Sequence, residues 1–171
     1  MSALDDAIAA NREAAKKFVS TARTVAKEKW AAPIAPGKWS PAQIVEHVAI
    51  STEVALKAIK GDKTVGSFPR LFRAVPRAMV FNPTLKKGAF PKGMKGPAIF
   101  APSKEHVSLD ASAARIERAV ANLEAHVRDL AKAGKDAFDH GFFGRLKVAD
   151  YVRFNGLHTN HHEKQLPPQP K

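Results

Sequence analysis

The segment Tyr151–Leu166 reads YVRFNGLHTNHHEKQL and contains three of the seven histidines of the chain. If the segment forms a helix, steps of three and four residues stay on one face. His158 and His162 then project in the same direction, about one turn apart. Two neutral imidazoles in that arrangement can bind one metal ion, so we expect the chain to fold around this pair and supply a third ligand. The same face carries Tyr151, Asn155 and Gln165.

Five other histidines are candidates for the third ligand: His47, His106, His126, His140 and His161. His47 is the best placed by pattern, because it lies at the edge of the apolar stripe of a predicted helix. His126 falls off the stripe of its own helix and should be solvated. His140 and His161 fit a turn residue and a flanking residue better than ligands. A structural or solvated histidine pair is the alternative, since two histidines four residues apart also arise by chance.

Helix signals surround this segment on its N-terminal side. A first helix is predicted over 2–29, where Ser2 and Asp5 resemble a capping box. The second begins at Ser40-Pro41, with Gln43 as the capping-box partner of Ser40, and runs to about residue 60. The third begins near Leu109, where apolar residues recur in steps of four and three, and Gly134 stops it. A seven-residue repeat of this length favours packing at a shallow angle.

The fourth helix is predicted over 147–166, after a turn at 139–146. Residues 61–107 form an irregular, basic connection rich in glycine and proline, with a short helix expected around 71–81. Residues 167–171 should form an exposed tail. Because no stretch alternates with period two, a sheet is not expected. The pattern indicates an all-α protein, with 1–171 as one domain.

Composition excludes several functional classes. The chain has no cysteine, which excludes disulfides, thiolate metal sites and a cysteine nucleophile. It has no apolar run long enough for a membrane span, so we expect a cytoplasmic protein without a membrane partner. Metalloprotease, serine-hydrolase and nucleotide-binding motifs are missing. The net charge of +12 could attract anionic partners, but no nucleic-acid motif accompanies it, so a solvated basic surface is the preferred interpretation.

Three motifs carry a resemblance to a known family: WSPAQIVEH at 39–47, HGFFGRL at 140–146 and HTNHHEKQ at 158–165. Together they resemble the DinB/YfiT-like superfamily of metal-dependent enzymes. The resemblance implies a four-helix bundle of up-down-down-up order, with 61–107 as the crossover between its second and third helices. It implies a divalent metal, zinc or nickel above others, held by His47, His158 and His162. It also suggests a homodimer.

The leading hypothesis is therefore an enzyme whose three-histidine metal site activates a water or a thiol, as a hydrolase or a thiol S-transferase does. Tyr151, Asn155 and Gln165 would hold a substrate or orient a ligand. A small anionic or thiol substrate is expected from the basic connection and the family resemblance. The alternatives are a non-enzymatic helical module that binds acidic partners or nucleic acid through its basic surface, and a relative that keeps the fold without the chemistry.

Overall fold

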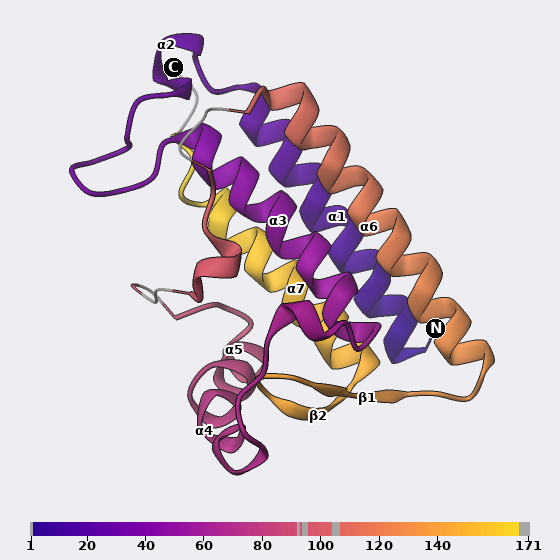
Figure 1. Cartoon of the computed structure of the whole chain (residues 1–171). Helices are drawn as coiled ribbons and strands as arrows, with labels where there is room; N and C mark the ends of the chain where they lie inside the picture. Colours follow the sequence, from indigo (N-terminus) through magenta and orange to yellow (C-terminus); the bar gives the residue numbers. More distant parts are fainter. Residues whose placement is uncertain (1, 92, 94–95, 104–106, 168–171) are drawn as a thin grey trace.

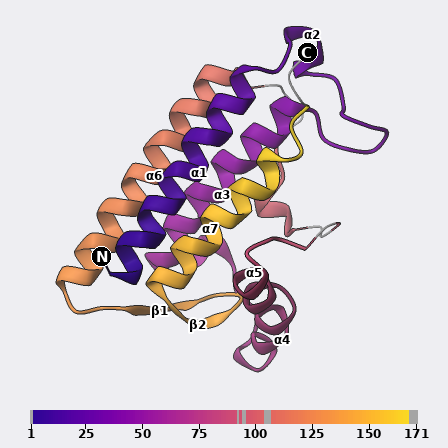
Figure 2. The same cartoon turned by 180° about the vertical axis from the view of Figure 1, so that it is seen from behind.

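A computed structural model of the chain describes residues 2–91, 93, 96–103 and 107–167. Long helices dominate it and lie side by side in both views of the molecule (Figures 1 and 2). The N-terminal helix α1 packs against α6 and α7, while α3 packs against α6 and α7 from the other side. This arrangement of long helices confirms the prediction of a mainly helical protein. The four long helices are α1 (Ala3–Arg23), α3 (Pro41–Ile59), α6 (Leu109–Lys132) and α7 (Val148–Glu163).

Short elements fill the connections between the long helices. After α3, the chain forms a series of short helical pieces before it reaches α6, and a two-stranded hairpin joins α6 to α7. These elements are α2 (Lys27–Trp30), η1 (Lys63–Val65), η2 (Arg70–Phe72), α4 (Ala74–Pro76), the π-type turn η3 (Arg77–Phe81), α5 (Asn82–Lys87), η4 (Ala98–Phe100), β1 (Ala137–His140) and β2 (Gly144–Lys147).

The predicted capping boxes are present at both helix starts. The Ser2 hydroxyl accepts from the Asp5 N–H at the start of α1, and the Ser40 hydroxyl accepts from the Gln43 N–H at the start of α3. In both motifs the third helical residue bonds back to the cap N–H, so two otherwise unpaired donors are satisfied at each end.

The prediction that the first helix reaches residue 29 is wrong. Helix α1 ends at Arg23, and α2 starts separately at Lys27. The Thr24 hydroxyl donates to the Thr21 carbonyl at 2.7 Å, and Ala26 is extended with ψ 140°. Threonine side chains compete in this way with helix continuation, and the periodicity of the apolar residues does not report it.

Two apolar clusters form the core. One lies between the first halves of α3 and α6 and the second half of α1, around Phe18, Val48 and Ile116. The other reaches the hairpin and includes Leu123, Leu146 and further residues. The central predicted stripe positions of α6 are all buried: Ala113, Ile116, Val120, Leu123 and Val127.

The hairpin corrects the expectation of no sheet. Strands β1 and β2 pair antiparallel, with Phe138 opposite Leu146, across part of the segment predicted as a turn. Each strand is only four residues long, which is too short for an alternating pattern to stand out. The turn packs closely against the crossover: a Cβ on Gly141 would lie 2.3 Å from the Gly66 carbonyl oxygen. Only glycine fits here, and its carbonyl accepts from the Phe68 N–H at 3.0 Å.

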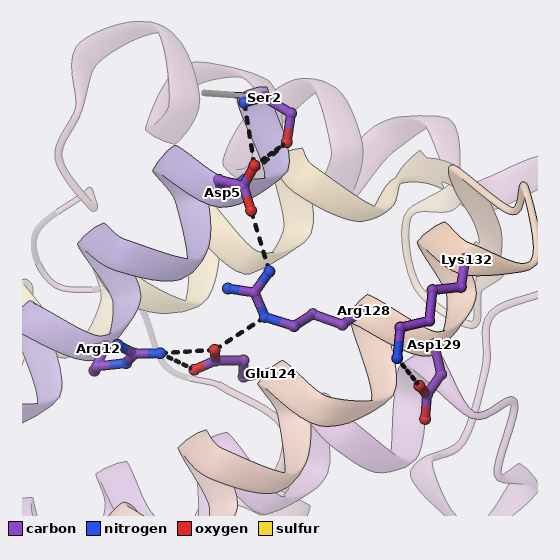
Figure 3. Close-up of polar contacts among 7 residues, drawn as sticks. All are labelled: Ser2, Asp5, Arg12, Glu124, Arg128, Asp129 and Lys132. Atoms are coloured by element: carbon purple, nitrogen blue, oxygen red, sulfur yellow. Dashed lines mark hydrogen bonds and ion pairs between the residues drawn. The ribbon is translucent and has the colours of Figure 1, made fainter.

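A polar network joins α1 to α6 on the surface (Figure 3). Arg12 donates to Glu124 at 2.6 Å, and Arg128 bridges Glu124 and Asp5 at 3.0 and 3.1 Å. The Arg12 and Arg128 guanidinium groups lower the pKa of Glu124. Exposed pairs of this kind contribute little each, so the network adds only modestly to the stability of the fold.

Among the described residues, the helices lack the combined length and apolar character that crossing a bilayer requires. The predicted single domain stays a prediction, and residues 168–171 of the predicted tail lie outside the described residues.

Candidate metal centre

Three histidines from two helices meet at one point. His47 lies in the second turn of α3, and His158 and His162 lie one turn apart near the end of α7. The His158 Nε2 atom is 3.3 Å from Nε2 of His47 and 3.1 Å from Nε2 of His162. One ring nitrogen from each residue lies within 4.8 Å of the other two. The predicted convergence of these residues is therefore present.

The opposite ring nitrogens of two members are already bonded. His47 Nδ1 is 2.6 Å from the Phe100 carbonyl oxygen, and His162 Nδ1 is 2.9 Å from Gln165 Oε1. Both partners accept, so in the neutral rings Nδ1 carries the hydrogen and Nε2 carries a lone pair. The Nε2 atoms of His47 and His162 thus both present lone pairs to His158.

Burial keeps these rings neutral. The side chains of His47 and His162 are buried, and His158 is half-buried as a residue. Burial lowers the pKa of His47 and lowers that of His162 to about 3. Burial, and then the charges of neighbouring histidines, lowers the pKa of His158 well below its ordinary value. Neutral imidazole is the form that binds divalent transition metals.

The geometry fits a divalent ion. Nitrogen ligands on a tetrahedral zinc at about 2.0–2.1 Å stand about 3.3–3.4 Å apart, close to the Nε2–Nε2 distances of His158 to His47 and to His162. A single proton on His158 Nε2 could satisfy only one of the two facing lone pairs. A cation held between the rings would satisfy all three nitrogens at once, so the donor set suits a metal better than it suits hydrogen bonding alone.

Aromatic residues that were not predicted from the sequence surround the three histidines. The Trp39 ring is 4.7 Å from the His47 ring and 6.4 Å from the His162 ring, measured between centroids. The Phe90 ring packs at 5.1 Å against His158. Trp39 could have been found from its place beside the helix cap Ser40, whereas Phe90 lies in an irregular connection that gives no such signal.

A buried carboxylate was also not foreseen as part of the surroundings. Glu46, which precedes His47, is only 6% exposed. Its Oε2 accepts from the Ser103 N–H at 3.0 Å and from the Ser103 hydroxyl at 3.1 Å. The same chain segment supplies the Phe100 carbonyl that fixes His47. Glu46 does not point in the direction of His47; it holds the crossover instead.

The other candidate histidines have different surroundings. His126 is half-buried on α6, and burial lowers its pKa. His140 ends β1, is buried, and bonds to the Tyr151 hydroxyl at 3.2 Å. His161 Nε2 accepts from the Gln165 amide at 2.9 Å. His106 lies outside the described residues.

The three residues predicted to hold a substrate or orient a ligand, Tyr151, Asn155 and Gln165, differ in how they lie relative to the three histidines. Gln165 contacts His162 and His161 and is placed to orient a ligand. The hydroxyl of Tyr151 bonds to His140, and the Asn155 amide donates to Asn11 of α1 at 3.0 Å. These contacts give Tyr151 and Asn155 structural partners away from the ring cluster, and a substrate role for them stays a prediction.

These features define a helical protein with a largely buried three-histidine cluster between two of its helices. The sequence profile of the DinB superfamily matches residues 10–166, which is most of the chain. The chain therefore belongs to the DinB superfamily, as its motifs indicated. Searches of curated proteins and of solved structures gave no match.

Proposed function

We propose that this DinB superfamily member is a metal-dependent enzyme in which His47, His158 and His162 hold one divalent ion, zinc or nickel above others. The observation that carries the proposal is the pair of Nε2 lone pairs that face His158 while their Nδ1 atoms are bonded elsewhere. The proposal includes the up-down-down-up bundle, which the courses of α1, α3, α6 and α7 in Figures 1 and 2 support.

The protein residues would each have a defined task. The three imidazoles bind the ion as neutral ligands, and burial keeps them neutral near pH 7. The Phe100 carbonyl and Gln165 orient two of the rings. When bound, the ion would lower the pKa of a water or thiol and so provide a nucleophile near neutral pH. Three protein ligands leave a tetrahedral ion one open position for that group.

The reaction class that follows is hydrolysis or thiol S-transfer on a small anionic or thiol substrate. A homodimer and a cytoplasmic location stay predictions. Two assays of the metal-loaded protein would separate these reaction classes. Hydrolysis of a series of labile esters would indicate a hydrolase. Transfer of a group from an electrophilic substrate to a thiol would indicate a thiol S-transferase.

The direct test measures the metal content of the protein. The purified protein is dialysed against zinc or nickel, and the free ion is then removed before the measurement. We expect about one ion per chain in the wild type, as one three-ligand site requires. His158→Ala should lose most of it, while His126→Ala, which removes a histidine of α6, should keep it. A wild-type chain that takes up no divalent ion, or a His158→Ala variant that binds as well as the wild type, would contradict the proposal.

A further inference from the structure

The helical run from η2 to α5 exposes its apolar residues. Of the seven large hydrophobic side chains that are exposed among the described residues, five lie within 68–79. Leu71 is 83% exposed and Met79 is 68% exposed. We call this set the apolar stripe: Phe68, Leu71, Phe72, Val75 and Met79.

Packing fixes the outward direction of the stripe. On the opposite side of the run, Phe81 is buried and its ring packs at 5.4 Å against Phe143 and at 4.9 Å against Phe154. Arg73 donates to Asp139 of the hairpin at 2.8 Å, and Arg77 donates to the Arg145 carbonyl at 2.8 Å. The run is therefore held to the protein by one face, and Leu71, Phe72, Val75 and Met79 lie on its solvent face. Phe68 lies just before the run; its ring packs at 5.1 Å against Phe142 of the hairpin turn, and the residue is 42% exposed. Figures 1 and 2 show this part of the chain protruding beside the hairpin.

The segment that carries the stripe is basic in sequence. Residues 63–103 contain no aspartate or glutamate. Arg70, Lys86 and Lys87 are exposed on the same helical run. An apolar helical face flanked by cations is the combination that enters the interface of a membrane rich in anionic lipid, where side chains are buried among acyl chains and cations meet headgroups.

A second copy of the chain fits this surface less well. Five side chains of this size expose on the order of 500 Å² of apolar surface, and a stable protein interface buries roughly 800 Å² per partner. Two copies joined through the stripe would also bring their cations together without an acidic residue from 63–103 to pair with them.

We propose that the apolar stripe and its flanking cations bind the surface of an anionic membrane. This revises the expectation of no membrane partner and goes beyond the proposed function, because it involves contact with the bilayer surface and does not depend on the metal site. The run that carries the stripe lies beside the hairpin, where α7 begins (Figure 1). His158 and His162 lie toward the other end of α7, where His47 of α3 meets them.

The experiment is flotation of the full chain with vesicles of phosphatidylcholine alone and of phosphatidylcholine with about one third phosphatidylserine. We expect binding to the anionic vesicles that weakens as salt is raised. Leu71→Ser/Met79→Ser keeps the net charge and should weaken binding at least about tenfold, since two large apolar side chains no longer insert. Ile34→Ser, which changes an exposed apolar residue outside the stripe, should bind like the wild type.

The contribution of charge is tested separately. Lys86→Gln/Lys87→Gln should weaken binding to anionic vesicles severalfold. Lys27→Gln/Lys29→Gln on α2 removes the same charge at another place and should change binding to anionic vesicles little. All these positions are exposed, so circular dichroism should show folded variants.

Three outcomes would overturn the proposal. The first is a wild type that does not float with anionic vesicles. The second is binding that the stripe variant retains in full. The third is a partner of another kind, found in a protein that does not bind vesicles. That partner would be a second copy of the chain, if self-association is lost in Leu71→Ser/Met79→Ser, or an acidic chain, if the protein binds polyglutamate.

Discussion

Glu46 holds the segment that orients His47, the first of the proposed metal ligands. Its buried carboxylate holds Ser103, and the same segment carries the Phe100 carbonyl that accepts from His47 Nδ1. Groups that bond to a ligand in this way fix its ring orientation, and their loss typically lowers metal affinity. Glu46 therefore acts on the site as a positioning residue, through the crossover, without contacting the ring cluster in the proposed ligand geometry.

Glu46→Ala should lower zinc affinity about tenfold, because the crossover and the Phe100 carbonyl would no longer be fixed. Glu46→Gln keeps an acceptor for Ser103 and should recover part of the affinity. Competition with a chromogenic chelator measures both. The control is Glu53→Ala, which removes a carboxylate of the same helix that pairs with Arg115. Equal zinc affinities in Glu46→Ala and Glu53→Ala would contradict the role of Glu46.

The sequence predicted the three histidines that converge but only part of their surroundings. His158 and His162 follow from helical spacing alone, because local geometry places residues four apart on one face. His47 was the best placed of five candidates by pattern, and the family motif also pointed to it. Trp39, Phe90, Glu46 and the Phe100 carbonyl depend on how an irregular crossover folds back over α3, and no periodicity encodes that course.

At the scale of elements, α1 and α7 approach closely at Gly156. A Cβ at this position would lie 3.1 Å from the Asn11 Cα and 3.5 Å from the Asn11 nitrogen. Both are backbone atoms, which cannot move without shifting a helix. Beside this contact, the Asn155 amide donates to the Asn11 side chain, and both residues are buried. The glycine thus allows a buried polar pair to form between the two helices.

Gly156→Ala should lower the free energy of unfolding by about 1–3 kcal/mol, because the added methyl separates α1 from α7. Helix propensity alone would give the opposite sign, a gain of about 1 kcal/mol. Urea denaturation monitored by circular dichroism decides between them. Ala125→Gly, at an exposed position of α6, calibrates the propensity effect on its own. A stabilised Gly156→Ala variant would show that the helices tolerate the methyl group.

Some elements are determined by local sequence, and others depend on contacts with distant parts of the chain. Helix starts such as Ser40-Pro41 and the stripe of α6 are local patterns, and both were predicted. The end of α1 at Arg23 depends on one threonine hydroxyl, and the hairpin depends on contact between Gly141 and the crossover. The π-type turn η3 directly precedes α5, which has Pro83 in its first turn. Where the two meet, the Asn82 N–H donates to the carbonyl of Arg77, five residues earlier. Proline lacks an N–H and its ring conflicts with regular helix geometry.

At the scale of the whole molecule, the strongly basic chain contains buried histidines that must stay neutral. His140 shows the effect apart from the proposed metal ligands. Its Nδ1 accepts from the N–H groups of Phe142 and Phe143, at 3.1 and 3.3 Å, and its Nε2 faces the Tyr151 hydroxyl. Burial, then the charge of Arg73, lowers its pKa to about 4, against an opposing effect of Asp139. Protonation would add a charge and remove the acceptor that closes the hairpin turn.

The sign of the pH dependence follows from the two pKa values. Between pH 6.5, the ordinary pKa of histidine, and about 4, the unfolded chain binds a proton at His140 that the folded chain does not. Stability must therefore fall as pH falls through this window, by about 3 kcal/mol from this residue, and show no further contribution below it. Urea unfolding of the metal-free protein at pH 7.5 and pH 4.5 measures the loss. His140→Asn, which has no group titrating in the window, should lose about 2–3 kcal/mol less than the wild type across the same interval. If both proteins lose the same amount, His140 is not the buried neutral base that its contacts describe, and the acid sensitivity of the fold lies with the three histidines proposed as metal ligands.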